Sequence, residues 1–185
     1  MKLSQDFECR GKRAVPWGCA GAIMFDRSKF EMLGGFDSTF FLDYEDLDIC
    51  WRGALCGWKT IFVPEARLYH KVGESEDEKL RRNNPAPRKS SLKINVRRQL
   101  SQSKNIGRFV LKTMPWPAVV GCFFVETLRI FGNLVRGHFL NARLQLRALI
   151  FNFKEMPEIL ELRRKIKAQA VLKNWEVLKQ WDAAR

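Results

Sequence analysis

The chain has 185 residues, enough for one domain with a substantial core or for a small domain with an appendage. Its 46% hydrophobic and 29% charged content is ordinary for a folded protein. Five cysteines form no C-x-x-C pair, and the two histidines are too few to support a structural zinc site, so reduced thiols in a cytosolic setting are expected.

Charge is distributed unevenly along the chain. Residues 1–78 hold 10 Lys and Arg against 14 Asp and Glu, whereas residues 79–185 hold 23 against 6. The basic part should favour an anionic surface, either phospholipid or nucleic acid. Its basic residues alternate with Leu, Ile, Phe and Val at helical spacing, and no nucleic-acid-binding motif is recognised. We therefore expect a membrane surface or a partner helix, and no nucleic acid, as partner; a plain helical bundle with a solvated basic face is the alternative.

Membrane-spanning and secretory segments are not expected. The opening "MKLSQDFECRGKR" lacks the apolar core of a secretory signal. The longest stretch without a charge, residues 113–125, is shorter than the ~20 apolar residues that span a bilayer. The predicted location is cytoplasmic, peripheral at the inner face of the plasma membrane.

The first predicted elements are short. "CAGAIMF" (19–25) is an apolar run typical of a buried strand. "DRSKFEMLGG" predicts a short helix, which Asp26 or Ser28 can cap and Gly34 can close in a left-handed conformation. A turn and an aromatic extended segment follow.

Residues 45–56 predict an amphipathic helix with Gly57 as its natural C-terminal cap. One apolar stripe runs along it, formed by Leu47, Trp51, Ala54, Leu55 and Trp58. "KTIFVPEARLYHKV" then predicts two extended pieces broken at Pro64, with His70 on the same face as Ala66 and Leu68.

A polar stretch rich in Pro, Asn and Ser over residues 73–91 predicts a loop and a domain boundary. The predicted division is a first domain over 1–78, a linker over 79–90 and a basic amphipathic helical region over 91–185. Helices are expected over 91–105, 118–135, 139–153 and, with Pro157 in its first turn, 157–181.

Four carboxylates fall within six residues at the start of the 45–56 helix. Asp48 and Arg52 have the i, i+4 spacing of a surface salt bridge. Asp43 precedes the helix and could cap it, and Glu45 lies near the first turn, where the helix dipole favours acids. These three therefore have structural explanations.

Asp46 has a catalytic interpretation as well as a structural one. Its helix face continues through the mostly small side chains of Ile49, Cys50, Gly53 and Gly57, which leave space beside it at the edge of the buried side. The helix N-terminus should keep Asp46 ionised, as a general base requires. Capping acids are common in this position, so both roles stay open. His70 has two interpretations as well, a hydrogen-bonded core residue or a metal ligand.

Residues Trp17–Ser75 resemble the C-terminal half of the catalytic domain of family 2 glycosyltransferases, particularly the rhamnosyltransferase-like enzymes of bacterial polysaccharide synthesis. The motifs that carry this resemblance are Gly21-Ala22, Gly34-Gly35-Phe36-Asp37, Phe40-Phe41, Glu45-Asp46, Asp48-Ile49-Cys50-Trp51-Arg52, Gly57-Trp58, Val63-Pro64-Glu65-Ala66 and His70. The basic helices resemble the C-terminal extension of the same family.

The resemblance implies an α/β fold, namely a partial GT-A (Rossmann-like) half-domain followed by an amphipathic α-helical region. It implies an inverting transfer of a sugar from a nucleotide-sugar donor to the hydroxyl of a lipid-linked or polysaccharide acceptor. Asp46 matches the general base of the family. Glu45 and three residues of the preceding turn (Gly35, Phe36 and Asp37) match positions beside the acceptor.

The resemblance also implies a divalent metal, manganese or magnesium. His70 matches the histidine that helps a D-x-D carboxylate to hold this ion in some members, where the ion screens the departing diphosphate. The half of the family domain that carries the D-x-D motif and the nucleotide pocket has no counterpart here, since 16 residues precede Trp17 and one βαβ unit takes ~30. "DLD" at 46–48 lies inside the predicted helix.

Three explanations of the missing half stay open: a truncated reading frame, one piece of a split enzyme whose other half is a separate chain, or a degenerate copy. The expected function is that of a glycosyltransferase, or the C-terminal part of one, in cell-surface polysaccharide synthesis. The alternative is a catalytically incomplete module that binds a membrane surface or a partner.

Overall fold

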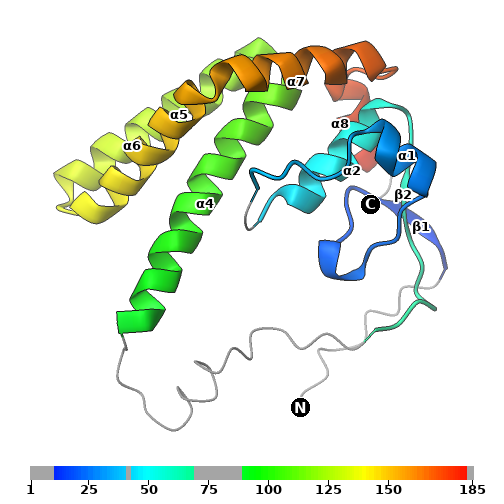
Figure 1. Cartoon of the computed structure of the whole chain (residues 1–185), viewed down its shortest axis with the longest axis horizontal. Coiled ribbons are helices and arrows are strands. Elements are labelled where there is room, and N and C mark those ends of the chain that lie inside the picture. The colour runs from blue at the N-terminus through cyan, green and yellow to red at the C-terminus, as the bar shows by residue number, and fades with distance from the viewer. Residues whose placement is uncertain (1–10, 41–42, 69–88, 183–185) are drawn as a thin grey trace, which may run out of the picture.

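The computed structural model describes residues 11–40, 43–68 and 89–182. Figure 1 shows these residues as two parts side by side, a first part of short elements and a second part built from long helices. The first part contains β1 (Arg13–Val15), a 3₁₀ helix (Ala20–Ala22), α1 (Arg27–Met32), α2 (Glu45–Leu55) and β2 (Thr60–Phe62). The second part contains α4 (Lys89–Thr113), α5 (Trp116–Val135), α6 (Phe139–Lys154), α7 (Met156–Gln169) and α8 (Asn174–Asp182).

Both predicted helices of the first part are confirmed, together with their ends. The N-cap of α1 is Asp26, whose Oδ1 accepts a hydrogen bond from the backbone N–H of Lys29 at 3.1 Å. Gly34 closes this helix with φ +77°, a left-handed conformation that glycine adopts without steric cost. Gly57 follows α2 with φ +81°.

The strand predicted over 19–25 is wrong. Residues 20–22 form a 3₁₀ turn without a buried residue, and Met24 is 96% exposed. A buried strand needs hydrogen-bonded neighbours. Within the described residues the sheet consists of β1 and β2 alone, paired antiparallel with Arg13 opposite Phe62. Of the two extended pieces predicted around Pro64, only the first forms a strand within the described residues.

Helices α5 and α6 form an antiparallel hairpin that packs along α4 (Figure 1). Helix α6 approaches α4 closely at Gly107, where an added β-carbon would overlap the amide nitrogen of Asn152 and force that side chain to move. That nitrogen donates a hydrogen bond to the backbone oxygen of Lys104 at 3.0 Å.

The single long helix predicted over 157–181 is wrong, because the chain breaks between α7 and α8. The backbone N–H groups of Val171 and Leu172 both donate to the backbone oxygen of Leu55, at 2.8 and 2.9 Å. Leu55 is the last residue of α2, where helix carbonyls lack partners within the helix. A contact that is distant in sequence therefore interrupts a locally regular helical pattern.

The two parts share one hydrophobic core. Phe40, Trp51 and Leu55 of the first part pack with Phe109 of α4 and Val177 of α8. The indole Nε1 of Trp51 also donates to Asn174 Oδ1 at 2.9 Å. The division at 79–90 stays a prediction, but the parts on either side of it are joined by this packing.

Among the described helices, α5 alone is long and apolar enough, by length and composition, to cross a membrane. The uncharged stretch of residues 113–125, judged too short to span a bilayer, ends before Glu126. That residue and Arg129 form an ion pair at 2.8 Å, and the apolar character continues beyond both. Core helices of soluble proteins can meet the same criterion, but they are mostly buried, and only 6% of the apolar window of α5 is buried.

Candidate functional site

Two residues with left-handed backbone precede the site. Asp43 and Tyr44 have φ of +66° and +76°, a conformation that costs a non-glycine residue roughly 1 kcal/mol. The side chain of Asn105 on α4 holds the turn by donating to the backbone oxygen of Asp43 at 2.8 Å. Strain maintained by tertiary contacts is typical of functional positions.

Asp43 does not cap α2, contrary to one of the expectations above. The N-cap residue is Tyr44, and its side chain makes no capping hydrogen bond. The carboxylate of Asp43 instead accepts from Gln102 Nε2 at 2.8 Å and lies 3.4 Å from Arg98 Nε. Its role is to tie the strained turn to α4.

Asp46 lies in the first turn of α2 and is partly buried. Its Oδ2 accepts a hydrogen bond from the backbone N–H of Ala20 at 3.3 Å, and its Oδ1 accepts from the N–H of Leu47 at 2.7 Å. The longer of these bonds is weak enough to yield to a ligand.

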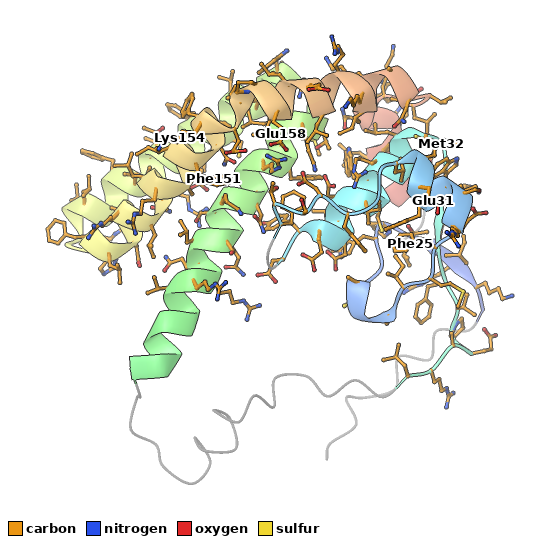
Figure 2. The ribbon with its side chains drawn as sticks, in the orientation of Figure 1. Phe25, Glu31, Met32, Phe151, Lys154 and Glu158 are labelled. Carbon is orange, nitrogen blue, oxygen red and sulfur yellow. The ribbon has the colours of Figure 1, made fainter. Side chains whose placement is uncertain are left out.

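A wide hollow of about 1170 Å³ lies along the helix face that continues from Asp46, although Asp46 itself is not among the residues that line it. Ile49, Cys50 and Gly53 line it, in agreement with the expected space along the helix face that continues from Asp46. On its other side Cys19 and Ala22 flank the residue that donates to Asp46. The remaining wall comes from α1, the two strands and the segments around them, including Phe25, labelled beside α1 in Figure 2.

Glu45 is adjacent to Asp46 and partly buried. Its Oε2 is shielded from solvent and has no hydrogen-bond partner among the described residues. Buried carboxylate oxygens are normally satisfied, so an unsatisfied one beside the expected base is a feature that a ligand hydroxyl could complete. Contact between Glu45 and an acceptor stays a prediction.

The structure places Asp37 in a buried ion network rather than in the hollow. Its carboxylate lies 2.8 Å from Arg108 Nε and 2.6 Å from Lys112 Nζ, and it also accepts from the Thr39 hydroxyl. Burial alone would raise the pKa of Asp37, but the hydrogen bonds from Arg108 and the charge of Lys112 outweigh it and hold this pKa well below its usual range. Arg108 also pairs with Glu158 at 2.6 Å.

Asp48 and Arg52 form the predicted pair, with 2.9 Å between Nη2 and Oδ2, but it is not a surface salt bridge. The side chain of Asp48 is fully buried, and Lys112 Nζ approaches its Oδ1 at 2.9 Å. Asp46 and Asp48 are two residues apart and therefore face roughly opposite sides of α2. Since Lys112 contacts both Asp37 and Asp48, Asp37 lies on the side of α2 away from Asp46.

Gly35 and Phe36 lie in the turn that α2 holds against α1. Arg52 Nη2 donates to the backbone oxygen of Gly35 at 2.7 Å, and the φ of Gly35 is +69°. The ring of Phe36 packs edge-on against Phe30, with centroids 5.3 Å apart, and is 40% exposed. Their place beside an acceptor stays a prediction.

His70, the predicted metal ligand, lies outside the described residues. No group of three or more His, Cys, Asp or Glu side chains within the described residues could hold a metal ion. The described residues thus do not by themselves fit the manganese or magnesium that the resemblance implies. Any such site depends on His70 and on carboxylates from elsewhere.

Sequence reasoning missed the residues of α4 that hold the site. Arg98, Gln102, Asn105, Arg108 and Lys112 form one stripe along this helix, and all contact the segment from Asp37 to Asp48. Their helical spacing and the opposite charges of the two parts were the available signals. Those signals were attributed to an external anionic surface.

Comparison with known proteins finds similarity to rhamnosyltransferases. The chain is 34% identical over 64 residues to the N-acetylglucosaminyl-diphospho-decaprenol L-rhamnosyltransferase of two strains of Mycobacterium tuberculosis, covering 35% of this chain and 21% of that enzyme. It is 40% identical over 57 residues to the rhamnosyltransferase WbbL of Escherichia coli, covering 30% of this chain and 21% of that enzyme. The chain thus matches about a fifth of each relative's length.

No family model and no solved structure matches the chain. The local similarity supports a glycosyltransferase relationship for the matched segment. The matched segments span 30–35% of this chain and 21% of each relative, so the similarity does not extend to a whole glycosyltransferase domain.

Proposed function

We propose that this chain supplies the acceptor side of a sugar transferase that works at a membrane surface. The observation that carries the proposal is the position of Asp46 at the start of α2, one turn before Ile49 and Cys50, which line a wide hollow, in a chain with local similarity to rhamnosyltransferases. The proposed reaction moves a sugar from a nucleotide-sugar donor to a glycan or lipid-linked acceptor with inversion.

In this reaction Asp46 accepts the proton of the acceptor hydroxyl. The hydroxyl oxygen forms a bond to the anomeric carbon of the sugar while the bond from that carbon to the diphosphate oxygen breaks. The nucleoside diphosphate leaves with the electron pair, and the proton remains on Asp46. Glu45, whose Oε2 lacks a partner among the described residues, hydrogen-bonds the acceptor.

The donor pocket is proposed to come from polypeptide outside these 185 residues, in the same protein or in a separate chain. The hollow is consistent with this arrangement, because its walls include the exposed apolar side chains of Trp17, Met24 and Ile61. Apolar surface of this extent normally has a partner. Any divalent metal would be held there together with His70, and no step above depends on it.

The acceptor of the Mycobacterium tuberculosis relative, as its name states, is a diphospho-decaprenol carrying N-acetylglucosamine. We propose a polyprenyl-diphosphate-linked sugar as the acceptor class here, and a location at the inner face of the cytoplasmic membrane. A substrate whose lipid lies in the bilayer requires an enzyme held at the bilayer surface.

A second candidate is a module without catalysis that binds a membrane or a partner through its helical part. The unpartnered outer surface of α5 and α6 favours it. The two functions are distinguished by assaying membranes that contain the chain and the polypeptide encoded next to it, with nucleotide-activated L-rhamnose and a polyprenyl-diphosphate sugar. Transfer that depends on the chain supports the first function, whereas unchanged transfer without the chain supports the second.

A further inference from the structure

The outer surface of the α5–α6 hairpin (residues 116–154) is strongly apolar. The large apolar side chains exposed on α5 are Trp116, Val120, Phe124, Val125, Leu128, Phe131, Leu134 and Val135, with exposed fractions from 45% to 71%. Those exposed on α6 are Phe139, Leu140, Leu146, Ile150 and Phe153. A surface of this size and composition is rare on soluble monomers and marks an interaction site.

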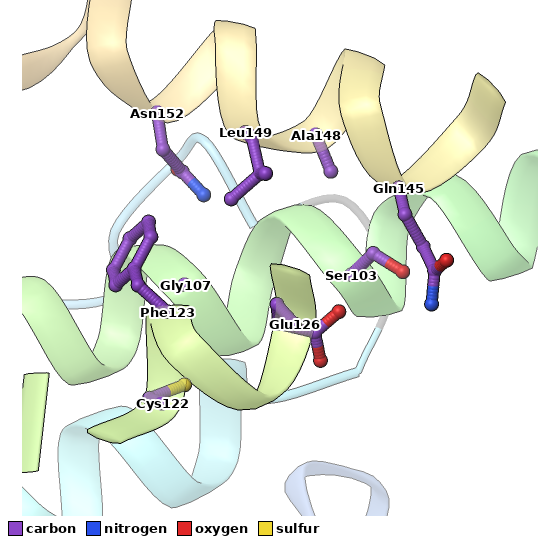
Figure 3. A pocket seen from close by; sticks show the side chains of 9 residues that line it. All are labelled: Ser103, Gly107, Cys122, Phe123, Glu126, Gln145, Ala148, Leu149 and Asn152. Atoms are coloured by element: carbon purple, nitrogen blue, oxygen red, sulfur yellow. The ribbon is translucent and has the colours of Figure 1, made fainter. Parts of the chain in front are cut away.

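The contacts between α4, α5 and α6 include polar side chains as well as buried apolar ones such as Val119, Leu144 and Ala148. Figure 3 shows Ser103 of α4, Glu126 of α5, and Gln145 and Asn152 of α6 around one small cavity of about 10 Å³. Asn133 Nδ2 also donates to Gln145 Oε1 at 2.9 Å across the two helices. A soluble helical bundle places apolar side chains inside and polar side chains outside. Polar contacts between helices and an apolar exterior are what helices surrounded by hydrocarbon show.

The charge of the hairpin indicates which kind of surface it contacts. Between residues 116 and 154 there is one acid, Glu126, against five Arg and Lys. Arg143, Arg147 and Lys154 form an exposed row on α6, next to the apolar row that contains Leu146 and Ile150. Basic and apolar rows side by side match the anionic headgroups and the acyl chains of a lipid monolayer.

The same residues argue for an in-plane rather than a crossing orientation. A 20-residue helix is about 30 Å long, so α5 alone could cross the hydrocarbon core. However, α6 packs along α5 and would bring Arg143 and Arg147 into that core. With the hairpin lying in the interface, these side chains reach the phosphates, and Arg129, whose side chain is 62% exposed, can extend to the same level.

A second copy of this chain is a less suitable partner. Two hairpins packed face to face would bring their Arg and Lys rows together, and the hairpin offers no acid besides Glu126, whose side chain is only 13% exposed. Like charges at an interface without counter-charges oppose association. An anionic bilayer supplies both the apolar and the negative surface.

We infer that the α5–α6 hairpin is an in-plane membrane anchor that inserts its apolar surface into an anionic bilayer. This inference rests on the proposed function only for the location of the enzyme at a membrane, because the surface itself is argued from packing and charge. Lipid binding is measured without sugar transfer, so either proposal can fail while the other stands.

Flotation of the purified full-length chain tests the anchor, using vesicles of phosphatidylcholine alone and vesicles with 30% phosphatidylglycerol. We expect flotation with the anionic vesicles that persists in part at 1 M NaCl, because the apolar insertion is not screened. The variant Phe124→Asp/Phe131→Asp should lose binding at least tenfold, and Arg143→Gln/Arg147→Gln should lose it about tenfold on anionic vesicles alone.

The matched control is Val171→Asp/Leu178→Asp, which places two acids at exposed apolar positions outside the hairpin and should float as the wild type does. Circular dichroism confirms that each variant is folded. Absence of wild-type flotation, or undiminished flotation of the Phe124→Asp/Phe131→Asp variant, would overturn the anchor. A third result would also overturn the anchor. In it, wild-type chains do not bind vesicles, and light scattering shows that they form a dimer which the Phe124→Asp/Phe131→Asp substitutions dissociate.

Discussion

Asp37 shows how a residue that matches a substrate-binding motif can serve the fold. Its carboxylate is almost enclosed by Arg108 and Lys112, and Lys112 also contacts the buried carboxylate of Asp48. The network joins the turn after α1, helix α2 and helix α4 at one point. Motif spacing indicated that Asp37 and Asp46 share a site, but the three-dimensional arrangement puts them on different sides of α2.

The variant Asp37→Asn tests the network. Removing one partner from a buried ion pair costs about 3–5 kcal/mol, and we expect the low end because Arg108 retains Glu158 and Lys112 retains Asp48. Urea denaturation at pH 7 measures the loss. The control Glu161→Gln removes an acid from an exposed pair with Lys165 and should leave the denaturation midpoint unchanged.

The same residue predicts an acid-dependent stability. The pKa of Asp37 is lower in the folded protein than the ~3.9 of an unfolded chain, so its stabilising effect is complete above about pH 4 and is lost as pH falls towards the lower folded value. Wild type should therefore lose stability between pH 4 and pH 2, as followed by urea denaturation. Asp37→Asn should show a shallower loss, and an equally steep one would contradict the role assigned to this carboxylate.

At the scale of elements, local patterns predicted what local interactions determine. The Asp26 cap, the Gly34 closure and the bounds of α2 follow from residues within one or two turns of each other. The predicted strand at 19–25 and the unbroken helix over 157–181 were wrong because their outcome depends on distant partners. A buried strand at 19–25 would need further strands beside it, and the described residues form a sheet of β1 and β2 alone. The helix over 157–181 is interrupted by hydrogen bonds to the backbone carbonyl of Leu55.

Gly107 provides a test of the α4–α6 packing. Glycine to alanine inside a helix normally stabilises by about 1 kcal/mol. Gly107→Ala should instead destabilise by about 1–3 kcal/mol, because the new methyl group overlaps the Asn152 amide. Thermal denaturation measures the change. The control is Gly121→Ala on α5, where no atom lies near the added methyl group and the normal stabilisation is expected.

At the scale of the molecule, the acidic and basic parts are complementary as well as separate in sequence. Helix α4 directs its cations and amides at the carboxylates and carbonyls between Asp37 and Asp48, while α6 leaves a basic row exposed. The sequence showed the charge imbalance. It could not show which basic residues pair inside the protein and which face an external partner, because residues of both kinds have the same helical spacing. Packing alone makes that division.

The shared core predicts one cooperative unfolding transition. Val177 of α8 is fully buried against residues from both parts, so Val177→Ala should cost about 2 kcal/mol and shift the whole transition. Tryptophan fluorescence and far-ultraviolet circular dichroism should report the same midpoint in wild type and variant. Two separate midpoints would instead support independent domains on either side of residues 79–90.

The assignment of Asp46 as the general base is tested most directly by the rate of sugar transfer in Asp46→Asn. The measurement is single-turnover transfer of labelled L-rhamnose to a polyprenyl-diphosphate sugar, in membranes that contain the chain with the polypeptide supplying the donor side. We predict a fall of about 10²–10⁴-fold, the contribution of a positioned base. The Asp46→Asn variant should be as stable in urea as the wild type. The control Glu31→Gln, which changes an exposed acid, should transfer sugar at the wild-type rate. A folded Asp46→Asn variant that transfers sugar at the wild-type rate would contradict the account.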